Sequence, residues 1–113
     1  MNNPEITFYG SREDLDALKK ALTDAKFQEI PRGFVYAHDP TGGGIIPPHI
    51  IFAIYSIHEM SKCIRVYLKE RSKRMIRRDG GDFVIKGNFT SSEFQEQVET
   101  CGQFTIEDEK HDG

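Results

Sequence analysis

Histidines are the residues of this chain best suited to metal binding or acid–base chemistry, and their spacing is unfavourable for both. His58 and Glu59 are adjacent, so on a helix their side chains point about 100° apart. A zinc-protease helix carries a second histidine four residues after the first, and Lys62 holds that place here. His49 lies nine residues before His58, too far to share a metal ion from one helical face. We therefore predict no metal site.

A run of three glycines at residues 42–44 invites comparison with phosphate-binding loops, because helix N-termini bind anions. A P-loop continues with Gly-Lys-Ser/Thr, whereas this segment is followed by Pro47 and Pro48, which lack amide donors. His38 and Asp39 precede the glycines and would need a distant partner to react. The pattern favours a flexible connection and no cofactor.

Nucleophiles are equally isolated in the sequence. No serine lies in a Gly-x-Ser-x-Gly motif. Cys63 has Lys62 beside it, whose charge would lower the pKa of the thiol, but no base follows at a fixed spacing. Cys63 and Cys101 are 38 positions apart and form no Cys-x-x-Cys pair, which favours free thiols in a reducing compartment. We predict no catalytic residue and no enzymatic activity.

The strongest charge signal is basic. Residues 62–78 hold eight lysines and arginines against Glu70 alone, a net charge of +7. Such a stripe can neutralise phosphates, although few aromatic residues are interleaved with it. It can equally be a solvated surface whose cations suit a helix C-terminus. The candidate anion-binding residues are Lys69, Arg71, Lys73, Arg74, Arg77 and Arg78.

Residues 79–113 reverse the sign, with nine acidic side chains against two basic ones. Glu93, Glu96 and Glu99 recur at helical spacing, and Asp79 and Asp82 lie nearby in the sequence. This acidic face either pairs with the basic stripe inside the fold or binds a basic partner. Immunity proteins that block nucleases use acidic surfaces in this way, because a nuclease site attracts phosphates.

The first half of the chain alternates between strand and helix patterns. Residues 6–9 alternate as a half-buried strand does, and leucines recur on one helical face within residues 11–27. A short strand is an option at residues 34–37. We expect one long helix from His49 to about Ser72, although residues 50–57, rich in β-branched and aromatic side chains, fit a buried strand as the alternative.

The second half predicts a hairpin and a last helix. Two strand-like runs, residues 75–78 and 83–86, flank an Asp-Gly turn. Thr90 with Glu93 has the spacing of a capping box and begins a helix. The order is β-α-(β)-α-β-β-α, an α+β fold in one small domain with strands packed against two main helices. That domain spans residues 1–106, and residues 107–113 form an acidic flexible tail.

Composition is that of a water-soluble globular chain, with 37% apolar and 29% charged residues among 113. No apolar run reaches the roughly 20 residues that span a bilayer, and the first residues lack the pattern of a signal peptide. We expect a cytoplasmic protein without membrane contact.

The region of about residues 40–99 combines a glycine-rich loop, a helix with a cationic end and a strand–turn–strand unit. Its features are Pro40–Gly44, Cys63–Lys69, Arg77–Gly80, Phe83–Ile85 and Ser91–Glu93. This arrangement resembles the bacterial effector-associated constant component family. The resemblance implies a non-enzymatic component encoded beside effectors in bacterial conflict systems.

The leading function is therefore a protein-binding accessory or immunity factor in a toxin or effector system, acting by stoichiometric contact. The alternative is a nucleic-acid-binding module that uses the basic stripe of residues 62–78. The expected partner is a toxin or effector protein, with nucleic acid as the second choice, and a homodimer is left open.

Overall fold

The computed structural model describes residues 4–31, 47–80 and 83–109. The possible strand at residues 34–37 and the glycines at 42–44 lie outside the described residues. The elements are, in chain order, β1 (Glu5–Tyr9), α1 (Arg12–Asp24), β2 (His49–Ala53), α2 (Ile57–Arg71), β3 (Lys73–Arg77), β4 (Val84–Ile85), α3 (Ser91–Thr100) and β5 (Gln103–Asp108).

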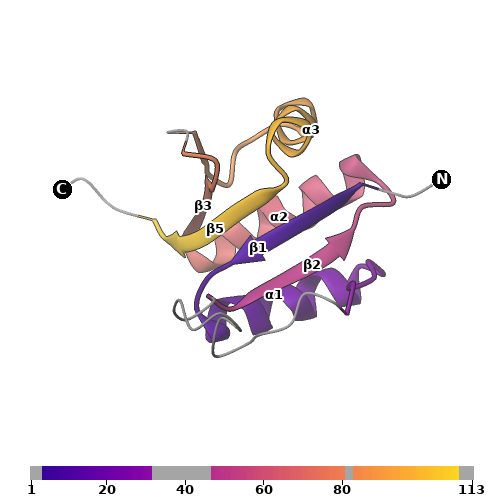
Figure 1. The fold of residues 1–113 in the computed structure, drawn as a ribbon, viewed down its shortest axis with the longest axis vertical. Helices are drawn as coiled ribbons and strands as arrows, with labels where there is room; N and C mark the ends of the chain where they lie inside the picture. Colours follow the sequence, from indigo (N-terminus) through magenta and orange to yellow (C-terminus); the bar gives the residue numbers. More distant parts are fainter. Residues whose placement is uncertain (1–3, 32–46, 81–82, 110–113) are drawn as a thin grey trace, which may run out of the picture.

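The strands form one mixed five-stranded sheet in the order β2-β1-β5-β3-β4 (Figure 1). β1 pairs antiparallel with β2 and parallel with β5, while β3 pairs antiparallel with both β5 and β4. The predicted α+β class and the single small domain with helices packed on strands are confirmed.

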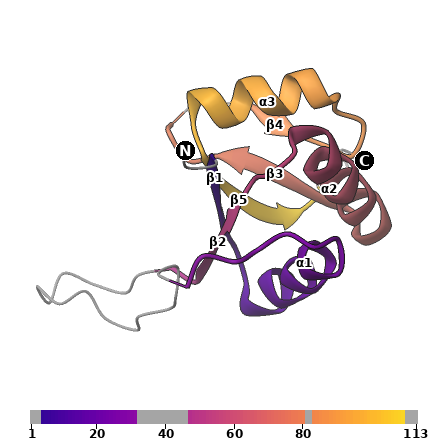
Figure 2. The ribbon, with the colours of Figure 1, turned by 90° about the vertical axis from the view of Figure 1, so that its right-hand side faces the viewer.

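One face of the sheet forms the core. Ile6 and Phe8 are fully buried, whereas the alternating neighbours in β1 are partly or fully exposed. The register places Phe8 opposite both Ile50 and Phe104, so the buried side chains of adjacent strands share this face. The helices cover it (Figure 2), and their buried apolar residues complete one continuous core.

Two helix starts carry side-chain caps, and the one at Thr90 follows the predicted capping box. The Ser11 hydroxyl accepts a hydrogen bond from the Asp14 amide at 3.1 Å, which satisfies an otherwise unpaired donor at the start of α1. The Thr90–Glu93 capping box is complete, with the two reciprocal bonds at 3.1 and 3.0 Å. The α1 helix and the last predicted helix are both confirmed.

The long helix expected from His49 is wrong in its first third. His49–Ala53 is β2, and α2 begins only at Ile57. Within β2 only Ile50 and Phe52 are buried, the period of two that a sheet imposes. Ser56 then accepts a hydrogen bond from the Glu59 amide at 3.2 Å and starts the helix. The alternative of a strand at residues 50–57 is therefore right for residues 50–53, whereas residues 54–56 connect the strand to the helix and Ile57 belongs to α2.

The tail boundary is also too early, because Gln103–Asp108 is strand β5, which the predicted order lacks. β5 lies between β1 and β3, and Phe104 and Ile106 are buried in the core. Glu107 and Asp108 pair across the ladder with Arg74 and Lys73, so they belong to the sheet.

The predicted hairpin is present as β3 and β4, although only Val84 and Ile85 form the second strand. Gly80 has a φ of +88°, a backbone conformation that glycine adopts without a steric penalty. Asp82 lies outside the described residues. Among the helices in the described part of the chain, none is long and apolar enough to cross a membrane.

Candidate protein-binding groove

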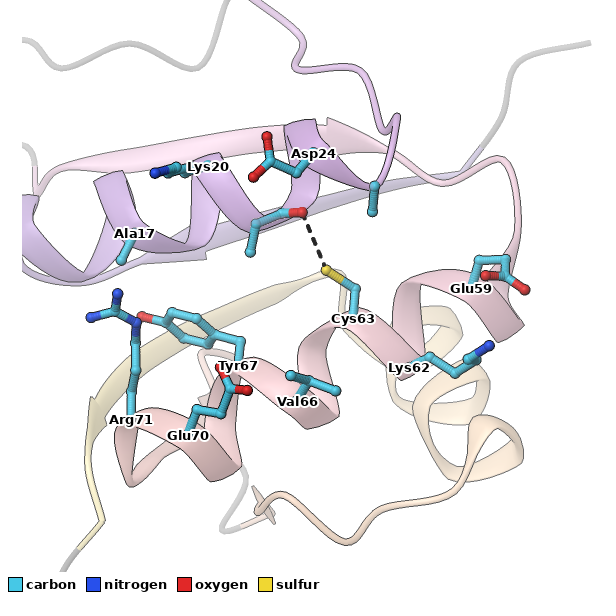
Figure 3. Close-up of a pocket in the computed structure, with 12 residues that line it drawn as sticks. Ala17, Lys20, Asp24, Glu59, Lys62, Cys63, Val66, Tyr67, Glu70 and Arg71 are labelled. Atoms are coloured by element: carbon cyan, nitrogen blue, oxygen red, sulfur yellow. Dashed lines mark hydrogen bonds between the residues drawn. The ribbon is translucent and has the colours of Figure 1, made fainter.

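An open groove of about 590 Å³ separates α1 from α2 (Figure 3). On the α1 side its wall includes Ala17, Ala21 and the C-cap residue Ala25, which recur every four residues and so lie along one side of the helix. The small alanine side chains leave the groove open, whereas the larger leucines of α1 fill its core-facing side. The α2 wall carries Val66, which is 53% exposed.

Two polar side chains are fixed in the groove. The Tyr67 hydroxyl donates a hydrogen bond to the Asp14 carbonyl at 3.0 Å, and burial together with the charge of Asp14 raises the pKa of Tyr67 to about 12. The Cys63 thiol donates to the Ala21 carbonyl at 3.5 Å. Burial, and then the charge of Asp24, raise the pKa of Cys63, so the expected lowering by Lys62 is wrong and the thiol is a poor nucleophile.

The three alanines and Val66 form an apolar floor of the groove, and charged side chains surround it. An apolar centre inside a polar rim is the usual composition of a protein-binding surface. The rim has three cations and three anions, so it carries no strong net field. Its charged residues are Lys20, Lys62, Arg71, Asp24, Glu59 and Glu70.

The predicted basic stripe does not form a single surface, because strand β3 sends alternate side chains to opposite faces of the sheet. On the helix side, Lys73 binds Asp14 at 3.0 Å and also Asp108, and these hydrogen bonds raise its pKa. Arg77, on the same side, binds Asp79 and donates to Gln97 Oε1 at 3.1 Å.

The other four predicted cations are distributed over three places. Arg74 binds Glu107 through two nitrogens on the sheet face opposite the three described helices. Arg78 lies on that same face. Arg71 stands at the groove with its guanidinium 5.8 Å from the Tyr67 ring centre, and Lys69 is exposed on α2.

The predicted acidic face is in part assembled. Glu93, Glu96 and Glu99 are exposed together on α3. The Glu93 carboxylate accepts the Thr90 amide at 3.0 Å, and Glu99 accepts from the Gln95 amide nitrogen at 3.1 Å. Asp79 does not extend this face, because its carboxylate binds Arg77.

A polar cluster between the first turns of α2 and α3 was not predicted. Ser61 is fully buried, donates to the His58 carbonyl at 2.9 Å and contacts the Ser91 hydroxyl at 2.6 Å. Ser91 in turn lies 3.4 Å from His58 Nδ1, and Arg65 donates to the Phe89 carbonyl at 3.2 Å. The cluster satisfies buried polar groups and ties α2 to α3. Ser61 and Ser91 are 30 residues apart, so no sequence motif could reveal it.

The two histidines of the described residues, His49 and His58, each contact a neighbouring polar group. His49 Nδ1 lies 3.1 Å from the Pro47 carbonyl, and no three metal-ligating side chains gather within the ranges that the structure describes. His38 and Asp39 lie outside those ranges. Comparison of the chain with protein-family models, with curated proteins and with solved structures found no match.

Proposed function

We propose that this chain is a non-enzymatic protein-binding domain that acts by stoichiometric contact and receives a helix of its partner in the α1–α2 groove. The supporting observation is Val66, an apolar side chain 53% exposed in the wall of a groove rather than on a convex surface. An amphipathic helix can lay its apolar face between two helices, and the burial of aliphatic side chains there drives association.

The rim defines the chemistry of that partner helix. In Figure 3, Lys20, Arg71 and Glu70 lie toward one end of the groove, and Asp24, Glu59 and Lys62 lie nearer the other. One end therefore has a net charge of +1 and the other of −1, and a partner helix with an acidic residue at one end of its apolar stripe and a basic residue at the other is complementary to both ends. Because the rim charges balance, the rim fixes orientation, the apolar floor supplies affinity, and binding survives moderate salt.

The biological setting is proposed on the sequence resemblance alone: an accessory or immunity factor in a bacterial toxin or effector system, with the toxin or effector as partner. The acidic face of α3 is the competing contact surface for such a partner. A nucleic-acid function through the whole basic stripe is less favoured, because Lys73, Arg74 and Arg77 each already bind a carboxylate.

Affinity purification of the tagged protein from its native host, with and without nuclease, tests the proposal. We expect one stoichiometric protein partner that survives nuclease and is lost in Val66→Glu. The glutamate is tolerated by the fold because position 66 is exposed on a helix and glutamate is a good helix former. Thr23→Glu is the matched control, since it adds the same charge to an exposed α1 position outside the groove.

Alkylation of Cys63 in a Cys101→Ser background gives a second measurement, because a bound helix covers Cys63. The partner should slow the reaction. A partner that stays with Val66→Glu but is lost when Glu93, Glu96 and Glu99 become lysine would move the contact to α3. Recovery of nucleic acid without any protein partner would overturn the protein-binding proposal.

A further inference from the structure

The second face of the sheet is open within residues 4–31, 47–80 and 83–109. Figure 1 looks onto this face, with β1, β2 and β5 in front and α2 behind them. Its residues are the partly exposed alternates of the buried core positions, such as Thr7 and Tyr9 in β1 and Thr105 in β5. This face is separate from the groove, which lies between the two helices on the far side of the sheet (Figure 3).

Three side chains with planar groups cross one end of this open face. The Arg78 guanidinium carbon lies 3.9 Å from the centre of the Tyr9 ring, the spacing of a direct cation–π stack. The Tyr9 ring lies 5.2 Å from the His49 ring, centre to centre, with 33° between their planes. The register puts Tyr9 beside His49 on β2 and beside Thr105 on β5, so these contacts follow from strand pairing.

The guanidinium is held in place before any ligand arrives. Arg78 Nη1 donates to Thr105 Oγ1 at 3.0 Å, and the Tyr9 ring supports its inner side. His49 is fixed by its contact with the Pro47 carbonyl at 3.1 Å. Arg78 is itself exposed, so its outer side presents a planar cation to solvent. Such a preorganised group binds with little loss of side-chain entropy.

We propose that this open face binds single-stranded nucleic acid, with a base stacked on the outer side of Arg78 and the adjacent phosphate near its charge. Unpaired bases stack on aromatic rings and on arginine guanidinium planes in this way, whereas the bases of a duplex are already stacked on each other. Arg74, on the same face, is neutralised by Glu107. Arg78 therefore supplies the cation, and few phosphates are neutralised.

This proposal does not depend on the groove, and it differs from the predicted basic stripe because one arginine and two aromatic rings carry it. It predicts a weak salt dependence. Each phosphate neutralised on a single strand contributes a slope of about −0.7 to the logarithm of affinity against the logarithm of salt concentration. With Arg78 as the main cation, the slope should be about −0.7, whereas a cluster of six cations would give about −4.

Fluorescence anisotropy with labelled oligouridine and oligothymidine of about ten nucleotides tests the proposal, since that length fits typical single-strand sites. A duplex of the same length is the reference. We expect both single strands to bind more tightly than the duplex. Arg78→Lys, which keeps the charge but removes the plane, should weaken binding about five- to hundred-fold, the usual loss of one stacked base.

Arg12→Lys is the matched control. Arg12 is also exposed, but it lies at the start of α1 on the helix side of the sheet and outside the groove. We expect it to bind as the unchanged protein does. The proposal is overturned if neither strand binds up to about 100 µM protein, the weak end of non-specific affinity. Equal binding of duplex and single strand, or equal losses in the two variants, would overturn it as well.

Imidazole NMR signals give a readout that does not rest on a variant. Adding the oligouridine should shift the His49 signals, whereas those of His58, at the start of α2, should stay in place. Tighter binding of oligouridine would identify RNA as the ligand, and equal binding would identify single strands of both kinds. A shift at His58 without one at His49 would contradict the proposed surface.

Discussion

Replacing Phe104 by alanine tests whether residues 103–108 are a central strand or the start of a frayed tail. Phe104 is fully buried, and its neighbours across the sheet are Phe8 on β1 and Arg77 on β3. Truncation of a buried phenylalanine costs about 3–5 kcal/mol, because the lost burial adds to the cavity left behind. A chain of 113 residues has a total stability of about 6–17 kcal/mol at roughly 0.05–0.15 kcal/mol per residue. The variant should therefore lose a large share of its stability.

Urea unfolding followed by circular dichroism measures this loss. We expect a lower midpoint with an unchanged slope, and a thermal midpoint reduced by roughly 12–20 °C, at about 4 °C per kcal/mol. Gln103→Ala is the matched control, because Gln103 is exposed on the same strand and its replacement should stay within about 0.5 kcal/mol. If both variants unfold alike, β5 does not contribute to the core and this view of the fold is refuted.

Two further predictions concern single side chains. The pKa of Tyr67 is about 12 in the folded protein and about 10 in the unfolded chain. Its contribution to the free energy of unfolding is therefore complete below pH 10 and is lost between pH 10 and 12. Between pH 10 and 12 the unfolding free energy of Tyr67→Phe should fall by about 2 kcal/mol less than that of the unchanged protein. An identical fall in the two proteins would contradict the buried phenol. Thr90→Ala should lower the unfolding free energy by about 1 kcal/mol through loss of the α3 cap, whereas Thr90→Ser should retain most of it. Equal stability of the alanine and serine variants would exclude the cap.

Local sequence signals predicted an element correctly wherever that element depends only on residues close together in the chain. The α1 leucines, the Thr90–Glu93 capping box and the Asp-Gly hairpin each need only a few residues in one stretch of chain, and all three are present. The β2 segment shows where such signals fail. Its apolar run fits both the helical and the strand period. The segment is a strand because its backbone pairs with the edge of β1 over residues 49–53.

The candidate sites could be predicted only in part. The run of cations is visible in the sequence, but the pairs that neutralise it come from distant positions, as with Lys73 and Asp14 or Arg74 and Glu107. The open-face stack likewise joins Tyr9, His49 and Arg78, which are far apart in the chain. No spacing rule links them, because strand pairing brings them together.

The amino-acid sequence by itself determined the α+β class, most of the helices and the hairpin, since these follow from short-range periodicity and capping. The tertiary structure decided the role of β5, the division of the basic residues between two faces, and the groove between α1 and α2. Those features depend on which strands pair and on which helix faces remain uncovered. Both are set by the packing of the whole core rather than by any local stretch of residues.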